Sequence, residues 1–400
     1  MSKVFIEEST LTSIGSAIRE KTGKSALIAP LNMANEIKSI TTGGGGGGEI
    51  SEEMRTFTGD ISYLFQNGRF LDWQDTVPFI LKDINRMGYL FNYCPANCDI
   101  SQIEINTLNY PDVNDGAYCN NLFSYSKNNS LPTINGRIAI LGGNLFSYCN
   151  YLTDDTLNNF FANPKLEFAW SNSNSRYSNP GINGMFSNCY SLRNINDILL
   201  RIHQYFRDNP ITYTSNLTDA YSSAFYSCYL LDEIRNIPIF EFPKHGANTS
   251  NIFSSTFGSC YRAKEITFMT NNGIPYKKQW KGQSIEFQYN IGYAAYPGNV
   301  YSYGISPDKE VKDDATYQAL KNDADWFTCK EEYSRYNHDS AVNTINSLPD
   351  TSEYLATAGG TNTIKFRGNC GKLTDGGAIN TLTAEEIAVA TAKGWTVSLF

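Results

Sequence analysis

The hydrophobic positions in the middle of the chain follow a short pattern that recurs seven times. In the fullest copy, residues 184–192, Met185 and Phe186 are followed by Cys189 and then by Leu192. This three-residue step predicts a short helical or 3₁₀ turn with one buried face. The copies recur every 23 to 40 residues, and such periods predict stacked repeats with the longer intervals as loops. The seven copies centre on Phe65, Phe91, Phe123, Phe146, Phe186, Phe225 and Phe257.

Short segments of alternating apolar and polar residues lie between these turns. Period-two alternation predicts strands, one for each repeat. One strand and one tight turn, stacked repeat upon repeat, predict a solenoid with a sheet on one face and with the insertions 171–180 and 199–216 as loops. The copies at Phe65 and Phe123 lack the Cys, so we expect distorted turns there. The alternating segments are 102–105, 137–141, 166–170 and 265–268.

The N-terminal segment has a helical pattern instead. Leu11, Ile14 and Ile18 share a face, and residues 10–40 predict a helical hairpin that is too small to bury its own apolar surface. This hairpin therefore requires a partner, either another subunit or a larger assembly. The glycine run at 43–48 follows, either as a flexible hinge or as part of a polyglycine bundle of several chains.

The C-terminal segment returns to an α/β pattern. Thr383 and Glu386 form a capping box that opens a helix, and 363–367 and 395–399 alternate as strands. The last strand is expected to pair at the edge of the repeats and cap them. A further helix is predicted at 339–348, with Asp339 or Ser340 as its cap, and another around 315–321.

The predicted fold class is α/β and rich in β-structure. It combines an N-terminal helical hairpin, a glycine linker, an irregular solenoid and an α/β C-terminal cap. The predicted segments are a helical module at 1–42, a polyglycine linker at 43–48, the solenoid at 49–270, an aromatic-rich insertion at 271–337 and the α/β cap at 338–400.

Composition narrows the classes of partner. The net charge is −8, and the absence of a basic run excludes nucleic acid as the expected partner. The sequence has neither a secretory signal pattern nor an apolar run of membrane-spanning length, so we expect no membrane insertion and maturation in the producing cytoplasm. Nine Cys are present, and five of them share one repeat position, which predicts a reduced, buried ladder.

The candidate chemistry is sparse. His203, His245 and His338 are far apart and lack metal-ligand spacing, so we expect no metal, no cofactor and no catalytic residue. Carboxylate pairs could serve a glycosidase only if two acids faced each other across a groove, and adjacent acids in polar loops are usually solvated. We therefore expect a protein that is not an enzyme. These pairs are Asp154 with Asp155, Asp313 with Asp314, and Asp323 with Asp325.

The aromatic-rich insertion supplies the candidate binding residues. Aromatic side chains at this density could form a carbohydrate-stacking face, although aromatic residues more often fill cores. The candidates are Trp280, Tyr289, Tyr293, Tyr296, Tyr301 and Tyr303.

Two resemblances connect these patterns to known families. The Met185-Phe186-Ser187-Asn188-Cys189-Tyr190-Ser191-Leu192 pattern resembles the BspA-like leucine-rich repeat of bacterial surface antigens, and its copies cover about half of the chain. The N-terminal pattern, with Ile18-Arg19-Glu20-Lys21-Thr22-Gly23, is similar to a short module that opens many phage tail and fibre proteins. The ending, 382–397, likewise resembles the ends of such repeat-bearing phage proteins.

These resemblances imply a phage virion structural protein, either a tail fibre or a baseplate-attached receptor-binding protein. The implied partners are other tail or baseplate proteins through 1–42 and a host cell-surface glycan or protein. Family analogy implies a homo-oligomer, such as a trimer, located on the virion. Two alternatives stay open: a purely architectural virion component, such as a head decoration or fibre spacer, and a bacterial surface adhesin with leucine-rich repeats.

Overall fold

A computed structural model describes the repeat region and the C-terminal segment of the chain. The described residues are 52–74, 78–112, 115–139, 143–169, 181–209, 220–228, 230–240, 252–260, 263–287, 336–366 and 382–399. The hairpin expected at 10–40, the glycines 43–48 and the helix expected at 315–321 lie outside them.

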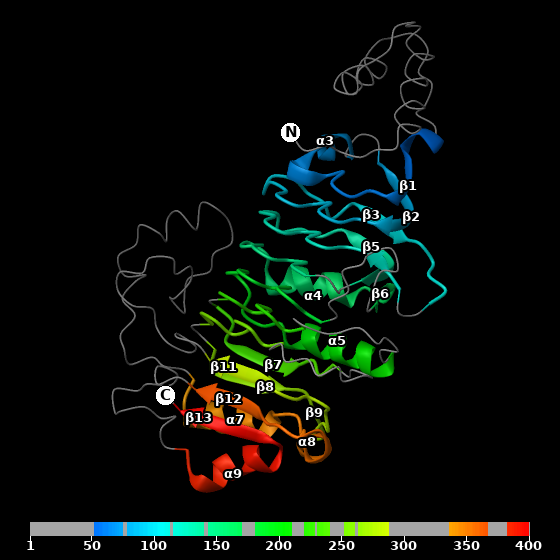
Figure 1. The fold of residues 1–400 in the computed structure, drawn as a ribbon. Helices are drawn as coiled ribbons and strands as arrows, with labels where there is room; N and C mark the ends of the chain where they lie inside the picture. The colour runs from blue at the N-terminus through cyan, green and yellow to red at the C-terminus, as the bar shows by residue number, and fades with distance from the viewer. Residues whose placement is uncertain are drawn as a thin grey trace, which may run out of the picture.

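The described residues form a mixed α/β fold in which most strands are parallel (Figure 1). One sheet has the order β1-β2-β3-β5-β4, with β6 added beside β5; β7 pairs with β8, and β11-β12-β13 form a third parallel sheet. Only β9 and β10 pair antiparallel among these strands. The strands are β1 Thr56–Asp60, β2 Ile80–Arg86, β3 Glu104–Thr107, β4 Ala117–Tyr118, β5 Thr133–Ala139, β6 Leu166–Ala169, β7 Glu233–Ile237, β8 Glu265–Phe268, β9 Thr270–Asn271, β10 Ile274–Pro275, β11 Ser284–Phe287, β12 Asn362–Phe366 and β13 Trp395–Leu399.

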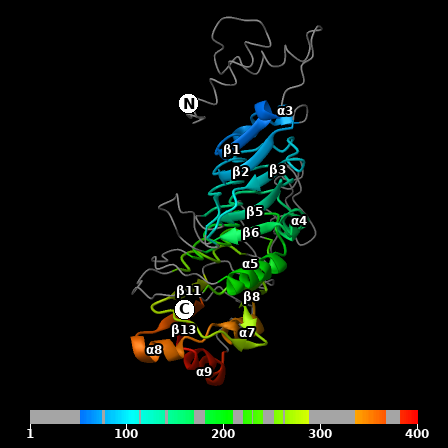
Figure 2. The ribbon, with the colours of Figure 1, turned by 90° about the vertical axis from the view of Figure 1, so that its right-hand side faces the viewer.

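Helices flank the strands at several levels of the stack (Figure 2). The loop predicted at 199–216 is wrong for residues 199–208, which belong to helix α5. The residues Ile198, Leu199, Ile202 and Phe206 recur at helical spacing in this helix and are buried. None of the described helices is long and apolar enough to cross a membrane. The helices are η1 Glu53–Arg55, η2 Gln66–Gly68, α3 Leu71–Gln74, α4 Asp154–Ala162, α5 Asn196–Asp208, α7 His338–Ser347, α8 Ser352–Ala358 and α9 Ala384–Ala392.

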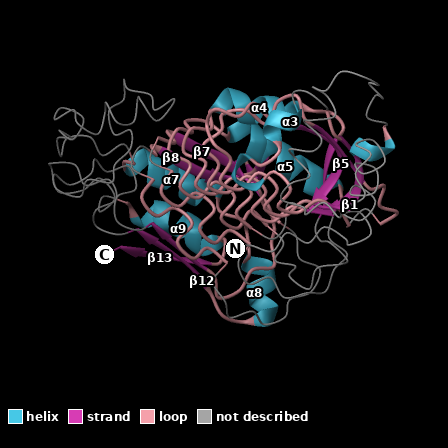
Figure 3. Cartoon of the chain, turned by 90° about the horizontal axis from the view of Figure 1, so that it is seen from above, coloured by secondary structure: helices cyan, strands magenta, loops and turns pink. Residues whose placement is uncertain are grey.

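The recurring phenylalanine pattern forms linked β-turns. Around Phe186, alternate backbone N–H groups close turns within the copy, as Cys189 N does with Phe186 O at 3.1 Å. The intervening N–H groups donate to the next copy: Phe186 N bonds Ala224 O at 3.1 Å. The predicted helical or 3₁₀ turn is therefore wrong for most copies, and a short 3₁₀ segment follows Phe65 alone among the seven phenylalanines. These turns are drawn in pink in Figure 3.

Each copy places two residues in the left-handed backbone region. They lie two positions before and two positions after the Phe, at the third residue of β-turns closed by i→i+3 bonds, and φ > 0 at that residue is typical of type II turns. The copies at Phe65 and Phe123 keep this geometry, so the distortion expected there is absent. The residues before the Phe are Tyr63, Tyr89, Asn121, Asn144, Gly184, Ser223 and Ser255; those after it are Asn67, Tyr93, Tyr125, Tyr148, Asn188, Ser227 and Ser259.

The phenylalanine rings form a continuous buried column. From Phe65 to Phe257, each ring stacks on the next with centroids 5.3 to 6.3 Å apart. The column continues through Phe287, 5.5 Å from Phe257, to Phe366. It therefore extends past residue 270, where the sequence pattern ends, and joins the C-terminal segment to the repeats through β11 and β12.

The repeated cysteines are buried, free thiols, as expected. Each thiol from Cys149 onward donates to the carbonyl oxygen of the Phe in the preceding copy; Cys189 Sγ lies 3.0 Å from Phe146 O. Burial raises the pKa of the Cys189 thiol, so it stays protonated and can donate. The Cys therefore satisfies a buried carbonyl and fills the core at the same time.

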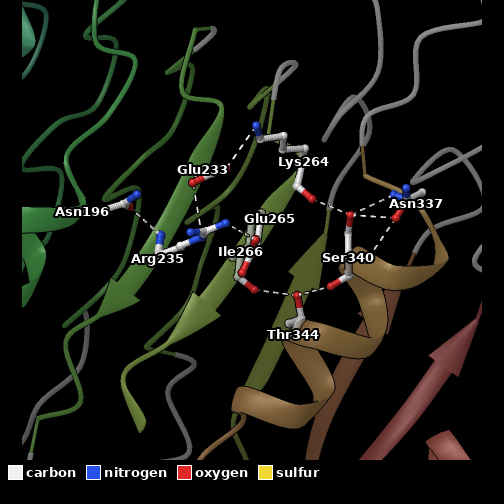
Figure 4. A network of polar contacts seen from close by, with 9 residues as sticks. All are labelled: Asn196, Glu233, Arg235, Lys264, Glu265, Ile266, Asn337, Ser340 and Thr344. Carbon is white, nitrogen blue, oxygen red and sulfur yellow. Dashed lines mark hydrogen bonds and ion pairs between the residues drawn. The ribbon is translucent and has the colours of Figure 1, made fainter. Parts of the chain in front are cut away.

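Helix α7 covers the edge of β8 where a further strand could pair (Figure 4). Thr344 Oγ1 donates to Ile266 O at 2.6 Å, and Ser340 Oγ donates to Lys264 O. The Phe268 N–H in turn donates to Ser347 Oγ at 3.0 Å. These hydroxyls lie four and three residues apart on one helix face, so the helix satisfies the backbone of a strand edge.

The C-terminal predictions agree with the structure in outline. Thr383 and Glu386 form the expected capping box of α9, and β13 pairs in parallel with β12. The predicted cap of α7 at Asp339 or Ser340 is wrong, because both residues lie inside the helix. Asn337 caps it and accepts a hydrogen bond from Ser340 N at 3.0 Å.

Candidate binding surface

The described member of the predicted aromatic set is a core residue. The Trp280 side chain is 3% exposed and packs against Phe253, with ring centroids 5.4 Å apart, and against Trp395 at 6.4 Å. In this position it offers no face to a ligand, in line with the alternative that such aromatic residues fill the core. The other candidates, Tyr289, Tyr293, Tyr296, Tyr301 and Tyr303, lie outside the described residues.

The histidines that the structure describes have structural partners. His203 is buried, accepts the Ile239 N–H at Nδ1 at 3.2 Å, and lies 3.2 Å from the Tyr276 hydroxyl through Nε2. His338 links α7 to α9 through Glu386, at 3.1 Å. Partial burial lowers the pKa of His338, but hydrogen bonds to Asp339 and Glu386 outweigh that effect and raise it. His245 lies outside the described residues.

Asp154 and Asp155 are the described acidic pair, and they lie in the first turn of α4. Asp154 accepts the backbone N–H groups of Arg193 and Asn194, at 2.9 and 3.0 Å, and so ties α4 to a neighbouring loop. The other predicted pairs, at 313–314 and 323–325, lie outside the described residues. Within the described part of the chain, no cluster of three His, Cys, Asp or Glu side chains could hold a metal ion.

A charged group on β7 and β8 is internally paired. Arg235 contacts Glu265 at 2.7 Å and Glu233 at 3.2 Å, and Lys264 contacts Glu233 at 3.1 Å (Figure 4). Opposite charges thus neutralise one another on an exposed face, where each pair contributes about 0–1 kcal/mol. This group has no surplus charge with which to attract a ligand.

A row of exposed tyrosines is the most unusual surface feature of the turns. Tyr93, Tyr125 and Tyr148 occupy the position two residues after the Phe in three successive copies. Their rings stack with centroids 4.8 and 4.3 Å apart, and the three side chains are 52%, 40% and 37% exposed. We call these three residues the Tyr93 row.

The backbone of the Tyr93 row is conformationally costly. All three residues have φ near +60°, which costs a residue other than glycine roughly 1–2 kcal/mol. Other copies place Asn67, Asn188 or a serine at the same position, and Asn tolerates this region best among residues with side chains. Stacking offsets part of the cost, at about 0.5–1.5 kcal/mol per aromatic pair. Because all seven copies share this left-handed backbone, the three exposed, stacked rings are what distinguish the Tyr93 row from the other copies.

Tyr63 and Tyr89, which lie two residues before Phe65 and Phe91, form a second stacked pair of tyrosines. The Tyr63 and Tyr89 rings are 5.0 Å apart and nearly parallel, and Tyr63 is 36% exposed. Arg86 and Asp60 form an ion pair at 3.4 Å nearby, and the Arg86 guanidinium lies 4.9 Å from the centre of the Tyr118 ring. Burial is the main cause that raises the pKa of the Tyr63 phenol, followed by its proximity to Tyr89.

Sequence reasoning missed both tyrosine groups. It weighed local aromatic density, whereas these tyrosines are separated by 23 to 32 residues and become neighbours only through stacking. Aligning the seven copies on the Phe and comparing the positions two residues to either side would have revealed them.

Comparison with known proteins found no matching family model, no similar curated protein and no similar solved structure.

Proposed function

We propose that this chain is a phage virion structural protein, a tail fibre or baseplate-attached protein that binds the host surface. The observation that carries the proposal is the Tyr93 row, three exposed stacked rings held on strained backbone. The described repeats would form an irregular leucine-rich-repeat-like solenoid, supported by the parallel strands and by the backbone bonds that join each turn to the next. The N-terminal resemblance supplies the assignment to a virion.

Attachment would be multivalent and would involve no catalysis. Residues 1–42 would hold the chain on the tail or baseplate, and a homo-oligomer such as a trimer would present several copies of the tyrosine surface. Linked weak sites act at high effective concentration, so overall avidity exceeds the affinity of any single site. Exposed tyrosines suit such contacts because they combine a rigid apolar ring with a hydroxyl and lose little conformational entropy on binding.

The test measures binding of labelled full-length protein to cells of the host strain. The variant replaces Tyr93, Tyr125 and Tyr148 with Asn, the residue that fills the same position at Asn67 and Asn188. Asn keeps the left-handed backbone and removes the rings, so the fold should persist. We expect the wild type to bind and the triple variant to bind at least about tenfold more weakly, as aromatic anchors dominate binding.

The matched control is Tyr226→Asn. The Tyr226 side chain is 38% exposed, close to the 37% of Tyr148 and the 40% of Tyr125, but it belongs to neither tyrosine group. It should bind like the wild type. A triple variant that binds as well as the wild type would remove the Tyr93 row from the proposal. Full-length protein that enters particles yet ignores host cells would instead favour an architectural component. Particles that still incorporate a chain lacking residues 1–48 would contradict the proposed anchoring.

A further inference from the structure

The Tyr93 row ends differently on its two sides. At the Tyr148 end, the next copy supplies Asn188, which is 6% exposed and whose Oδ1 accepts the Tyr190 hydroxyl at 3.3 Å. At the other end, Tyr93 is 52% exposed, the largest value in the row. Among the described residues, no ring stacks on the face of Tyr93 that is turned away from Tyr125. The row is therefore occupied at one end and open at the other.

Asn67 lies beside the open face of Tyr93. Its backbone N–H donates to Asn92 O at 2.9 Å, which places Asn67 one copy before Tyr93 and on the side away from Tyr125. The φ angles of Asn67 and Tyr93 are 58° and 57°, so their side chains leave equivalent turns in the same direction. Asn67 is exposed, and its amide group has no hydrogen-bond partner in the described part of the chain.

An asparagine next to a tyrosine leaves a step in this surface, which we call the Asn67 step. An Asn side chain ends at its δ atoms, whereas a Tyr ring begins at Cγ and extends to the hydroxyl. The outer part of the Tyr93 ring therefore stands clear of Asn67 and forms the wall of the step, with the Asn67 amide as its floor. An amide has an acceptor oxygen and two N–H donors, so the floor can both accept and donate.

This combination fits a sugar ring. The apolar face of a pyranose can lie on the wall while its hydroxyls bond the floor, and ligand sites typically combine an apolar surface with a few orienting polar groups. The bond from the Tyr190 hydroxyl to Asn188 demonstrates the same pairing of hydroxyl and amide at the equivalent turn position. The amide floor is uncharged and the chain has a net charge of −8, so a neutral sugar fits better than an anionic one.

We propose that Tyr93 and Asn67 form a subsite for a neutral pyranose unit of a host cell-surface polysaccharide. This inference deepens the proposed attachment function and rests on it for the source of the ligand. The Tyr93 ring carries the apolar face of the sugar, and the Asn67 amide exchanges hydrogen bonds with its hydroxyls. Tyr125 supports the wall from behind, because its ring stacks on the inner face of Tyr93 with centroids 4.8 Å apart.

The test uses full-length protein and immobilised single-sugar conjugates read by biolayer interferometry. The neutral probes are glucose, galactose, mannose, rhamnose, N-acetylglucosamine and N-acetylgalactosamine. The competing probes are glucuronate, which is anionic, and a decaproline peptide, because proline-rich segments also dock on aromatic side chains.

The key variants remove the floor and then rebuild the step elsewhere. Asn67→Gly removes the amide, and glycine adopts the φ of 58° without strain. Adding Tyr93→Asn to this variant places an asparagine directly before Tyr125, so the step is recreated one copy further along. The triple variant with Asn in place of Tyr93, Tyr125 and Tyr148 removes every wall, and Tyr226→Asn is the control.

We expect at least one neutral probe to bind the wild type and to bind Asn67→Gly about two- to tenfold more weakly, the effect of losing one hydrogen bond. The double variant should recover most of this loss, a result that misfolding cannot produce. The triple variant should lose at least about tenfold, and the control should bind like the wild type.

The proposal is overturned if no neutral probe binds, if glucuronate or decaproline binds best, or if Asn67→Gly binds as the wild type does. A double variant that stays as weak as Asn67→Gly would also overturn it. Full-length protein that binds host cells but no neutral probe would remove the subsite and leave the attachment function standing. Protein that binds a neutral probe but no host cells would do the reverse.

Discussion

Replacing Gly184 with alanine should destabilise the protein through two separable effects. Gly184 has φ of +56°, which costs an alanine roughly 1–2 kcal/mol. A Cβ at this position would lie 2.1 Å from Asn144 Oδ1, so the Asn144 side chain must move. Displacing a packed neighbour costs about 1–3 kcal/mol, and the two effects together predict a loss of about 2–5 kcal/mol.

Two companion variants separate these effects. Gly273→Ala has the same backbone problem, with φ of +82°, but its Cβ would meet no atom within 4 Å, so we expect only the loss of about 1–2 kcal/mol. Asn144→Gly removes the obstructing side chain at a residue whose own φ is +61° and which therefore accepts glycine. Combined with Gly184→Ala, it should recover about 1–3 kcal/mol of coupling energy.

The measurement is urea unfolding of the full chain, followed by circular dichroism, for the wild type, the three single variants and the double variant. Amide hydrogen exchange of the segment around Gly184 would localise the effect. If Gly184→Ala costs no more than Gly273→Ala, or if its cost is unchanged in the Asn144→Gly background, the close approach between successive turns is refuted.

Two other predictions concern the C-terminal helix and the buried thiols. Thr344→Val should lower stability by about 1–3 kcal/mol for each group left unpaired, because the Tyr336 hydroxyl and Ile266 O are both 2.6 Å from the lost Oγ1. Thr344→Ser should lose less, since it keeps the hydroxyl, and equal urea midpoints for the two variants would contradict the edge-covering role. Iodoacetamide should label half-buried Cys98 in the native protein but Cys189 only in denaturant, because burial holds the pKa of Cys189 far above its usual value. Equal native labelling of both, measured by peptide mass spectrometry, would show that the thiol column is open to solvent.

The sequence predicted the inward-facing residues better than the backbone between them. Phe186 and Cys189 stand out because core positions demand apolar side chains at fixed spacing. The left-handed positions two residues to either side accept Gly, Asn, Ser and Tyr alike, so no single residue type marks them. Helix α5 replaces part of the predicted loop at 199–216, because Ile198, Ile202 and Phe206 recur at helical spacing and are buried.

The far end of the column and the tyrosine surface depend on long-range contacts. Phe287 and Phe366 lie on strands and have no Cys three residues later, so the motif could not identify them as members of the column. In the sequence, nothing distinguishes Tyr93 and Tyr125 from other tyrosines in polar turns. Only the stacking of the repeats brings their rings to 4.8 Å from each other. The local density of aromatic residues instead predicted Trp280 as a binding residue, and Trp280 is buried.

The backbone bonds between turns have an evolutionary consequence. They connect positions counted from each Phe, so their register is the same whether 23 or 40 residues separate one Phe from the next. Loop-closure entropy rises only slowly with length, so longer connections are tolerated. The connections between turns can therefore change in length during evolution, while the buried strands and helices that they join, such as β6 and α5, keep their places against the column of rings.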